Sequence, residues 1–256
     1  MRSAILLSFC FLICGLLPAQ APESPHTFAV ATIKPSKPDA TVLTQIRGNR
    51  FVTEGTTFVD VFKYAYNVHP DQVVGGPTWL WTEKFDILAD PEMEKRPSSD
   101  QMKAMVQQLL EERFHLVMHH EQKILSVYAV VKTADTPKLT KSTADPSGIP
   151  VVGYNPSGEL QVGNATMANF ATFLQRFVLD RPAVDQTGIA GRFDLVLRWT
   201  PDNFRTGGKP VDAQEDASAH PGLFTAMKEQ LGLKLQPTKA PTDVFLIDRV
   251  EQPSEN

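Results

Sequence analysis

The sequence predicts an α+β protein made of two tandem repeats, each with the element order β-α-β-α-β-β, whose helices pack on mixed, largely antiparallel sheets. The first observation is a unit at residues 221–251, where a helical pattern precedes an alternating strand, a proline-containing turn and an apolar strand. The second observation is the recurrence of this unit at residues 98–133. The third is a nearly constant spacing between equivalent residues of the two copies, which indicates an internal duplication.

Four pairs of equivalent residues define that spacing. The upstream pairs are Thr57 with Thr166 (166−57 = 109) and Phe85 with Phe193 (193−85 = 108), and the downstream pairs are Phe114 with Leu231 (231−114 = 117) and Val127 with Val244 (244−127 = 117). The difference of nine residues (117−108) places an insertion in the polar stretch 200–222. Insertions are tolerated in surface loops, so the change in spacing falls where the chain can accept it.

The boundaries of the elements in the first copy follow from capping residues and prolines. Thr57 and Ser98 are typical N-cap residues, and Gln101 completes a capping box with Ser98. Pro35 ends the first strand because proline cannot donate to a strand ladder. The predicted elements are strands over residues 27–35, 84–89, 114–119 and 127–131, and helices that start at Thr57 and Ser98.

The second copy gives the same order. Thr166 is its N-cap residue, and Gly232 follows a helix at the position where a left-handed residue ends it. Pro237 and Pro241 bracket the turn of the predicted closing hairpin, so its two strands are expected to be antiparallel. The predicted elements are helices over residues 167–179 and 223–231, and strands over residues 192–199, 231–236 and 244–247.

The chain divides into a leader, two repeats and a connecting segment. Positive charge at Arg2, an apolar run and a small-residue cleavage site predict a signal peptide. Cys10 and Cys14 both lie in that leader, so the mature chain has no thiol for a disulfide or a metal. The predicted segments are the signal peptide 1–21, the first repeat 22–133, a linker 134–158, the second repeat 159–251 and a tail 252–256.

Several segments together resemble a known family. They are FAVATIKPS, GGPTWL, FDI, LLEERFHLVMHHEQKILSVYAVV, TGIAGRFDLVLRWTPD and the closing stretch from LFTAMKEQLGLKLQPTKAPTDVFLIDRVE. Over nearly all of the mature chain they are similar to the soil-associated acidobacterial family of uncharacterised secreted proteins, the DUF3738 type. The resemblance implies an exported protein and brings no catalytic residues. Related domains end receptor metallopeptidases of the BlaR type, but this chain lacks the HExxH motif and the membrane helices of those receptors.

Three histidines form the densest set of candidate metal ligands. On a strand, His115 and His119 would share one face, and His120 follows directly. A zinc site needs three or four ligands, so a further ligand would have to come from a distant part of the chain. The alternative is a solvated strand face opposite apolar residues. The sequence therefore predicts no metal and no cofactor, with His115, His119 and His120 as the candidates if a metal binds.

Aromatic and acidic residues give two further candidates. Tyr66, Trp79 and Trp81 flank a glycine turn and could form an exposed contact surface, or they could close a small core. Asp86 and Asp194 follow equivalent phenylalanines in different repeats. We expect a repeated structural role for these aspartates, such as accepting a backbone or Arg/Lys hydrogen bond on the exposed sheet face, rather than paired acid–base catalysis.

These observations favour an exported, non-catalytic binding or interaction module that acts in the periplasm or outside the cell. Its partner is an envelope or extracellular protein or a small ligand. The chain shows no basic stripe for nucleic acid and no permanent membrane span after signal cleavage. Two alternatives stay open: an enzyme acting on an envelope or extracellular polymer, with its site between the repeats, and a sensor domain detached from a BlaR-type receptor.

Overall fold

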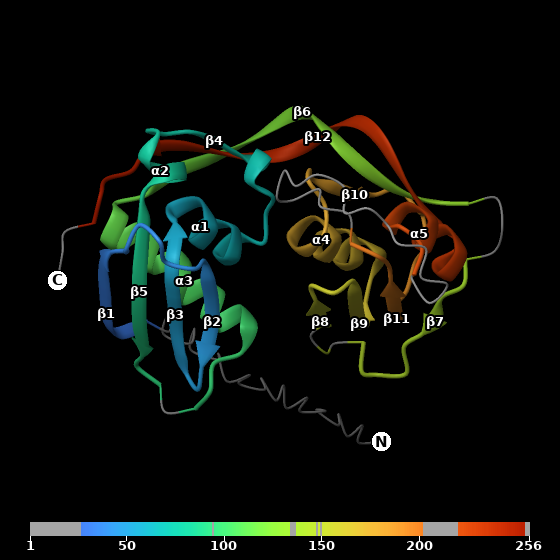
Figure 1. Ribbon diagram of the computed structural model, residues 1–256, viewed down its shortest axis with the longest axis horizontal. Helices are drawn as coiled ribbons and strands as arrows, with labels where there is room; N and C mark the ends of the chain where they lie inside the picture. Colours follow the sequence, from blue (N-terminus) through green and yellow to red (C-terminus); the bar gives the residue numbers. More distant parts are fainter. Residues whose placement is uncertain are drawn as a thin grey trace, which may run out of the picture.

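The computed structural model describes residues 27–93, 95–133, 137–146, 148, 150–201 and 220–253. Within these ranges the protein has two α/β halves that lie side by side and are bridged by two long strands (Figure 1). The predicted signal peptide over residues 1–21 lies outside the described residues. The mixed α+β class and the largely antiparallel sheets are confirmed.

Two antiparallel sheets have the same strand order. The strands of sheet A are β1 (Phe28–Pro35), β2 (Leu43–Arg47), β3 (Arg50–Thr57) and β5 (Lys84–Pro91), arranged β1-β5-β3-β2. The strands of sheet C are β7 (Thr140–Lys141), β8 (Val151–Asn155), β9 (Glu159–Ala165) and β11 (Phe193–Arg198), arranged β7-β11-β9-β8. The n-th strand along the chain therefore takes the same place in each sheet, and β2 and β8 form the two edges that face each other in Figure 1.

The third sheet and the helices lie between and above these two sheets. Sheet B contains β4 (Val73–Gly75), β6 (Val117–Lys132), β10 (Ala183–Asp185) and β12 (Leu233–Arg249), in the order β10-β6-β12-β4. The helices are α1 (Phe58–Tyr66), the 3-10 turn η1 (Pro70–Gln72), α2 (Trp79–Thr82), α3 (Ser99–Phe114), α4 (Met167–Phe177) and α5 (Leu223–Leu231). Pairing is antiparallel between β6 and β12 and parallel where β4 and β10 join them.

Capping explains where the main helices begin and end. Thr57 and Thr166 cap α1 and α4, and Ser98 caps α3, each through a complete capping box. Gly232 ends α5 with φ at 66°, a left-handed conformation that glycine adopts without strain. These four caps are the ones that the sequence predicts.

Each half has its own hydrophobic core, and each core is completed by a strand end from the other half. In the first half, Phe62 of α1 packs edge-on against Phe245 of β12, with ring centroids 5.4 Å apart. In the second half, Leu233 at the start of β12 is buried together with Val130 at the end of β6. Helices α1 and α3 are thereby covered by sheet A on one side and by the β6–β12 ribbon on the other.

The prediction that each repeat closes with its own hairpin is wrong. Residues 117–132 form one continuous strand, β6, and residues 233–249 form another, β12, and these two pair with each other. Phe114 ends α3 rather than beginning a strand. A strand follows each helix as predicted, but β6 and β12 pair with each other instead of each forming its own hairpin.

Proline placement explains the mistaken turn. The backbone N–H of Tyr128 donates to the carbonyl oxygen of Pro182, at 2.8 Å, on the β10 side of β6. The facing residue Pro237 therefore belongs to a pair that exchanges no hydrogen bonds, and its nitrogen points to the open edge of β12. Pro241, four residues later, points the same way. Neither proline interrupts the ladder, because a residue whose nitrogen faces the open edge needs no N–H group for strand pairing.

The segment expected as a linker, 134–158, contributes two strands to sheet C. β7 pairs with β11, and β8 pairs with β9 over five residues without a register shift. Its composition is rich in proline, serine and threonine, which usually marks loops. Val152 and Tyr154 nevertheless alternate with more exposed neighbours and pack against the second core, so the period-2 pattern prevails.

The exchange of strand ends predicts an effect at a distance along the sequence. Replacing Phe245 by alanine should remove about 3 kcal/mol of unfolding free energy, because it leaves a cavity among aromatic rings of the first half. Native-state hydrogen exchange should then show lost protection in α1 and α3. The half-buried neighbour provides a matched control, since Leu246→Ala should cost clearly less. Loss of protection confined to α4 and α5 would contradict the exchanged arrangement.

Candidate functional site

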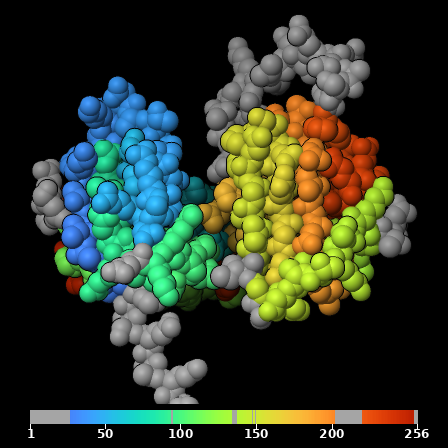
Figure 2. Space-filling model, turned by 90° about the horizontal axis from the view of Figure 1, so that it is seen from below, coloured from blue at the N-terminus to red at the C-terminus, as the bar shows by residue number. Residues whose placement is uncertain are grey.

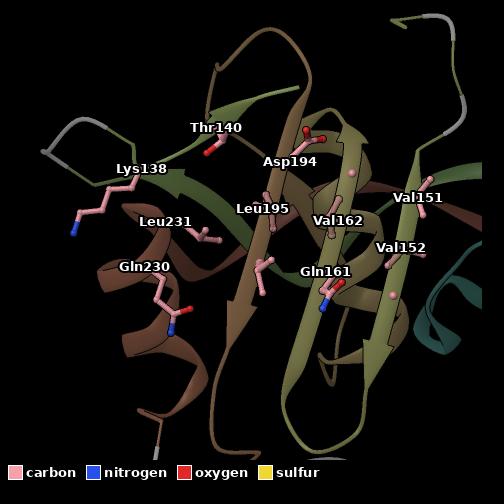
Figure 3. Close-up of a pocket in the computed structure, with 13 residues that line it drawn as sticks. Lys138, Thr140, Val151, Val152, Gln161, Val162, Asp194, Leu195, Gln230 and Leu231 are labelled. Carbon is pink, nitrogen blue, oxygen red and sulfur yellow. The ribbon is translucent and has the colours of Figure 1, made fainter. Parts of the chain in front are cut away.

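The open face of sheet C carries a hollow of about 670 Å³ (Figure 3). Gly153 and Gly163 leave its floor without side chains, and a Cβ at Gly163 would come no nearer than 3.7 Å to any neighbour. Val151 and Val196 flank it and are 67% and 40% exposed. Figure 3 shows Lys138 extending away from the strands, where its ammonium donates to the carbonyl oxygen of Glu229 at 2.9 Å. The hollow thus combines apolar and polar surface.

The corresponding face of sheet A carries a hollow of about 750 Å³. Some of its lining residues lie 108 or 109 positions before residues that line the hollow on sheet C. The matched pairs are Val52 with Gln161 (161−52 = 109), Asp86 with Asp194 (194−86 = 108) and Leu88 with Val196 (196−88 = 108). Leu88 is 42% exposed, close to the value for Val196, so both sheets present an apolar residue to solvent at this position. The two faces therefore have equivalent backbone positions and different side chains.

An ion pair marks the same place on both sheets with its charges reversed. On sheet A, Arg50 of β3 pairs with Asp90 of β5. On sheet C, Glu159 of β9 accepts from Nε of Arg198 on β11 at 2.6 Å. Spacings of 109 (159−50) and 108 (198−90) relate the partners. The Arg198 guanidinium and the Gln161 amide lower the pKa of the Glu159 carboxyl, with the Gln161 hydrogen bond the larger cause.

Asp86 and Asp194 fill matching structural roles. The carboxylate of Asp86 accepts from the backbone N–H of Gly55 at 3.0 Å, and that of Asp194 accepts from the N–H of Asn164 at 2.8 Å. Both donors sit in left-handed conformations, with φ of 61° and 52°, next to irregularities in the strand ladder. The expected acceptance of a backbone hydrogen bond is confirmed, and no paired-carboxylate geometry arises because each aspartate stays on its own sheet.

A chain of stacked side chains crosses from one half to the other between the inner edges β2 and β8. Phe51 contacts Tyr64 of α1, with ring centroids 5.1 Å apart. The Arg176 guanidinium of α4 lies 5.5 Å from the Tyr64 ring centre and 4.9 Å from that of Phe177. Phe177 in turn stacks on Tyr154 of β8, at 5.2 Å. We call Tyr64, Arg176, Phe177 and Tyr154 the aromatic–arginine ladder.

Hydrogen bonds hold the two halves together beside this ladder. Nη1 of Arg176 donates to the side-chain oxygen of Asn67, at 3.1 Å. The buried amide of Gln175 donates to the carbonyl oxygen of Asn67 at 3.3 Å and accepts from the N–H of Ala183 at 3.0 Å. Burial lowers the pKa of Arg176 and raises the pKa of Tyr64. The charge interaction between the two side chains acts in the opposite direction and partly offsets both shifts. In Figure 2 a furrow separates the blue and cyan strands of the first half from the yellow strands of the second.

The two hollows differ in chemistry. Apolar, amide and carboxylate side chains line the hollow on sheet C, whereas several charged side chains line the hollow on sheet A. Broad sheet faces with a few amide and carboxylate groups suit the recognition of a flat or extended partner.

The three candidate histidines have different surroundings. His115 is the C-cap of α3, with φ at 49°, so it does not share a strand face with His119 as predicted. Nδ1 of His119 lies 2.8 Å from the carboxylate of Asp248, and the His120 ring packs against Phe245. Over the part of the chain that the structure describes, no three His, Cys, Asp or Glu side chains are grouped to hold a metal ion.

The three candidate aromatic residues do not form one patch. Tyr66 stacks on Phe62 at 4.4 Å, and burial raises the pKa of its hydroxyl to about 12. Trp79 packs on the first core, 6.0 Å from the ring of Phe58. Trp81 is the exposed member. The sequence analysis did not find the aromatic–arginine ladder, because its residues come from both halves of the chain. The one available signal was the spacing of the N-caps of α1 and α4, which indicates equivalent positions for these two helices.

A family model described as "Protein of unknown function (DUF3738)" matches residues 59–250, which is 192 residues (250−59+1) of 256. The chain belongs to the DUF3738 family. The DUF3738 match spans both halves and both long strands. No curated protein and no solved structure matches the chain. Among the described helices of this DUF3738 protein, none is long and apolar enough to cross a membrane.

The aspartate contacts predict a stability effect on each sheet. Asp194→Ala should lower the unfolding free energy by about 1–3 kcal/mol, because the part-buried N–H of Asn164 loses its acceptor. Urea denaturation measures the change. Asp194→Asn keeps an oxygen acceptor and should cost less, and Asp86→Ala is the matched variant on sheet A. Unchanged stability in both alanine variants would contradict the structural role.

The His119 contacts predict a titration. The hydrogen bond to Asp248 raises the pKa of His119 above 6.5, with a smaller contribution from Glu121. The ion pair therefore supports folding below about pH 6.5 and loses this effect as pH rises through the folded-state pKa. An NMR titration of the ring should show a larger fall in pKa for Asp248→Asn than for Glu121→Gln. Equal pKa values in all three proteins would refute the pairing.

Proposed function

We propose that this protein is an exported, non-catalytic binding module built by internal duplication, and that its partner lies across the outer faces of sheets A and C. Both hollows and the furrow between them open on this side, as Figure 2 shows for the strand faces. The observation that carries the proposal is the placement of two hollows at equivalent positions on sheets A and C, each with an exposed apolar residue, Leu88 or Val196.

The register between β6 and β12 supports the duplication. Paired residues have numbers that add up to 365 over most of the ladder, for example Val127 with Thr238 and Glu121 with Val244. Adding 117 to the bounds of β6, 117 and 132, gives 234 and 249, which nearly coincide with the bounds of β12 (Leu233–Arg249). Ile124 and Pro241, which are equivalent by this spacing, face each other at the centre of the ladder. Two strands with equivalent bounds, each following a helix, are what an internal duplication would produce.

Export is supported by the leader over residues 1–21, whose charge, apolar run and small-residue end are those of a signal peptide. The absence of cysteine after residue 14 is compatible with an oxidising compartment. We place the chain with the secreted, soil-associated members that its segments resemble. Its site of action is the periplasm or the cell exterior.

The two hollows provide the test. The mature chain, immobilised and incubated with the envelope fraction of its own cell, should retain partners that mass spectrometry identifies. Leu88→Glu combined with Val196→Glu places a charge in both hollows and should abolish this capture, because a partner would have to bury an unpaired carboxylate.

Val30→Glu is the matched control. Val30 is a more exposed apolar residue, at 61%, on a strand of sheet A and lines neither of the two hollows. Capture should persist in this variant. An unchanged set of partners in the double variant, or turnover of an envelope polymer by the pure protein, would contradict the proposal.

A further inference from the structure

The edges of the three sheets differ in how well they are protected against pairing. β4 and β10 have three residues each and β7 has two, so they offer little ladder to another strand. β1 has a register irregularity near its start and ends with Lys34 and Pro35. Short length, irregularity, lysine and proline are the devices that block edge pairing in natural sheets. Four of the six described strands at the ends of the sheets carry at least one of them, and the open stretch of β12 carries Pro237 and Pro241.

Of the two remaining edge strands, β8 has none of these devices, and β2 has only the charged Arg47 at its end. Each has five residues that pair with its inner neighbour without a register shift. β8 reads Val-Val-Gly-Tyr-Asn and contains neither a charge nor a proline. No described residue forms a backbone ladder with the outer side of either strand. β2 and β8 are the edges of their sheets that face the other half of the molecule (Figure 1).

The furrow also contains a cation without a counter-ion. Arg176 is half-buried in the aromatic–arginine ladder, and its contacts are the Asn67 oxygen and the two rings. Within the described ranges, no carboxylate lies at ion-pairing distance from it. Burial lowers the pKa of Arg176, which reflects the cost of keeping this charge away from water. A carboxylate brought by a ligand would relieve that cost.

We propose that the furrow binds an extended acidic segment of a partner protein, which adds a strand to the open edge of β8 and places a carboxylate on Arg176. Main-chain hydrogen bonds to β8 supply affinity, and side chains at alternate positions supply specificity. An inward-facing apolar or aromatic side chain of the segment lies beside Tyr154 and Phe177. The next inward-facing position, about 7 Å along the strand, carries the carboxylate. The inference rests on the proposed binding function and names the class of partner.

Peptide display on the folded mature chain, residues 22–256, tests this proposal. Random ten-residue peptides selected on the wild-type protein should become enriched in sequences that alternate apolar and polar residues, with Asp or Glu two positions from an aromatic residue. The enriched peptide should bind Arg176→Gln at least about tenfold more weakly, since a charge-assisted hydrogen bond is lost. Arg198→Gln is the matched control and should bind normally, because Arg198 is already paired with Glu159 on the outer face.

Backbone methylation separates strand addition from other binding modes. Two versions of the peptide carry N-methyl groups on alternate residues, one on the odd and one on the even positions. A strand added to an edge uses one set of N–H groups only, so one version should lose binding and the other should retain it. Hydrogen exchange should slow for amides of residues 151–155 when the peptide binds, a readout that needs no protein variant.

Several results would overturn the proposal. These are no enrichment, equal loss with both methylated versions, full binding to Arg176→Gln, and pairing of β8 with a second copy of the chain instead of a peptide. If display fails while the hollow-dependent capture from the envelope succeeds, the acidic-strand inference falls and the binding module stands. If both fail, the proposed function falls with it.

Discussion

The antiparallel ladder between β6 and β12 ties every other part of the structure together. Each strand starts in one half and ends in the other, so each core contains residues from the far end of one of these strands. Burying Phe245 and Leu233 in opposite cores links the stability of the halves to the pairing of the ribbon. The hydrogen bonds beside Arg176 close the assembly at the other end. The faces of sheets A and C are consequently held in one fixed relation.

Sheets A and C have the same strand order but different side chains on their outer faces. The same positions carry glycine and glutamine on sheet C and charged or branched residues on sheet A. The supporting parts, such as the capping boxes and the aspartates that accept from left-handed residues, are retained in both. Retained support with altered surfaces suits a molecule whose halves contact different parts of one partner.

Features determined by neighbours in the chain could be predicted from the sequence. The caps at Thr57, Ser98 and Thr166 follow from local hydrogen bonding. The single long strands could not be predicted from the sequence. Proline occurs both in turns and at strand positions whose nitrogen faces an open edge, so its presence does not distinguish the two. The aromatic–arginine ladder was equally hidden, since Tyr64 and Arg176 meet only when the halves are assembled.

The reversed ion pairs have a consequence for a chain that contains two similar sheets. If β3 were to pair with β11 instead of β5, Arg50 would face Arg198. If β9 paired with β5, Glu159 would face Asp90. Like charges directly opposite each other weaken strand pairing, whereas the observed partners attract. Swapping the sign at one equivalent position thus lets each strand distinguish its own sheet from the sister sheet while the chain folds.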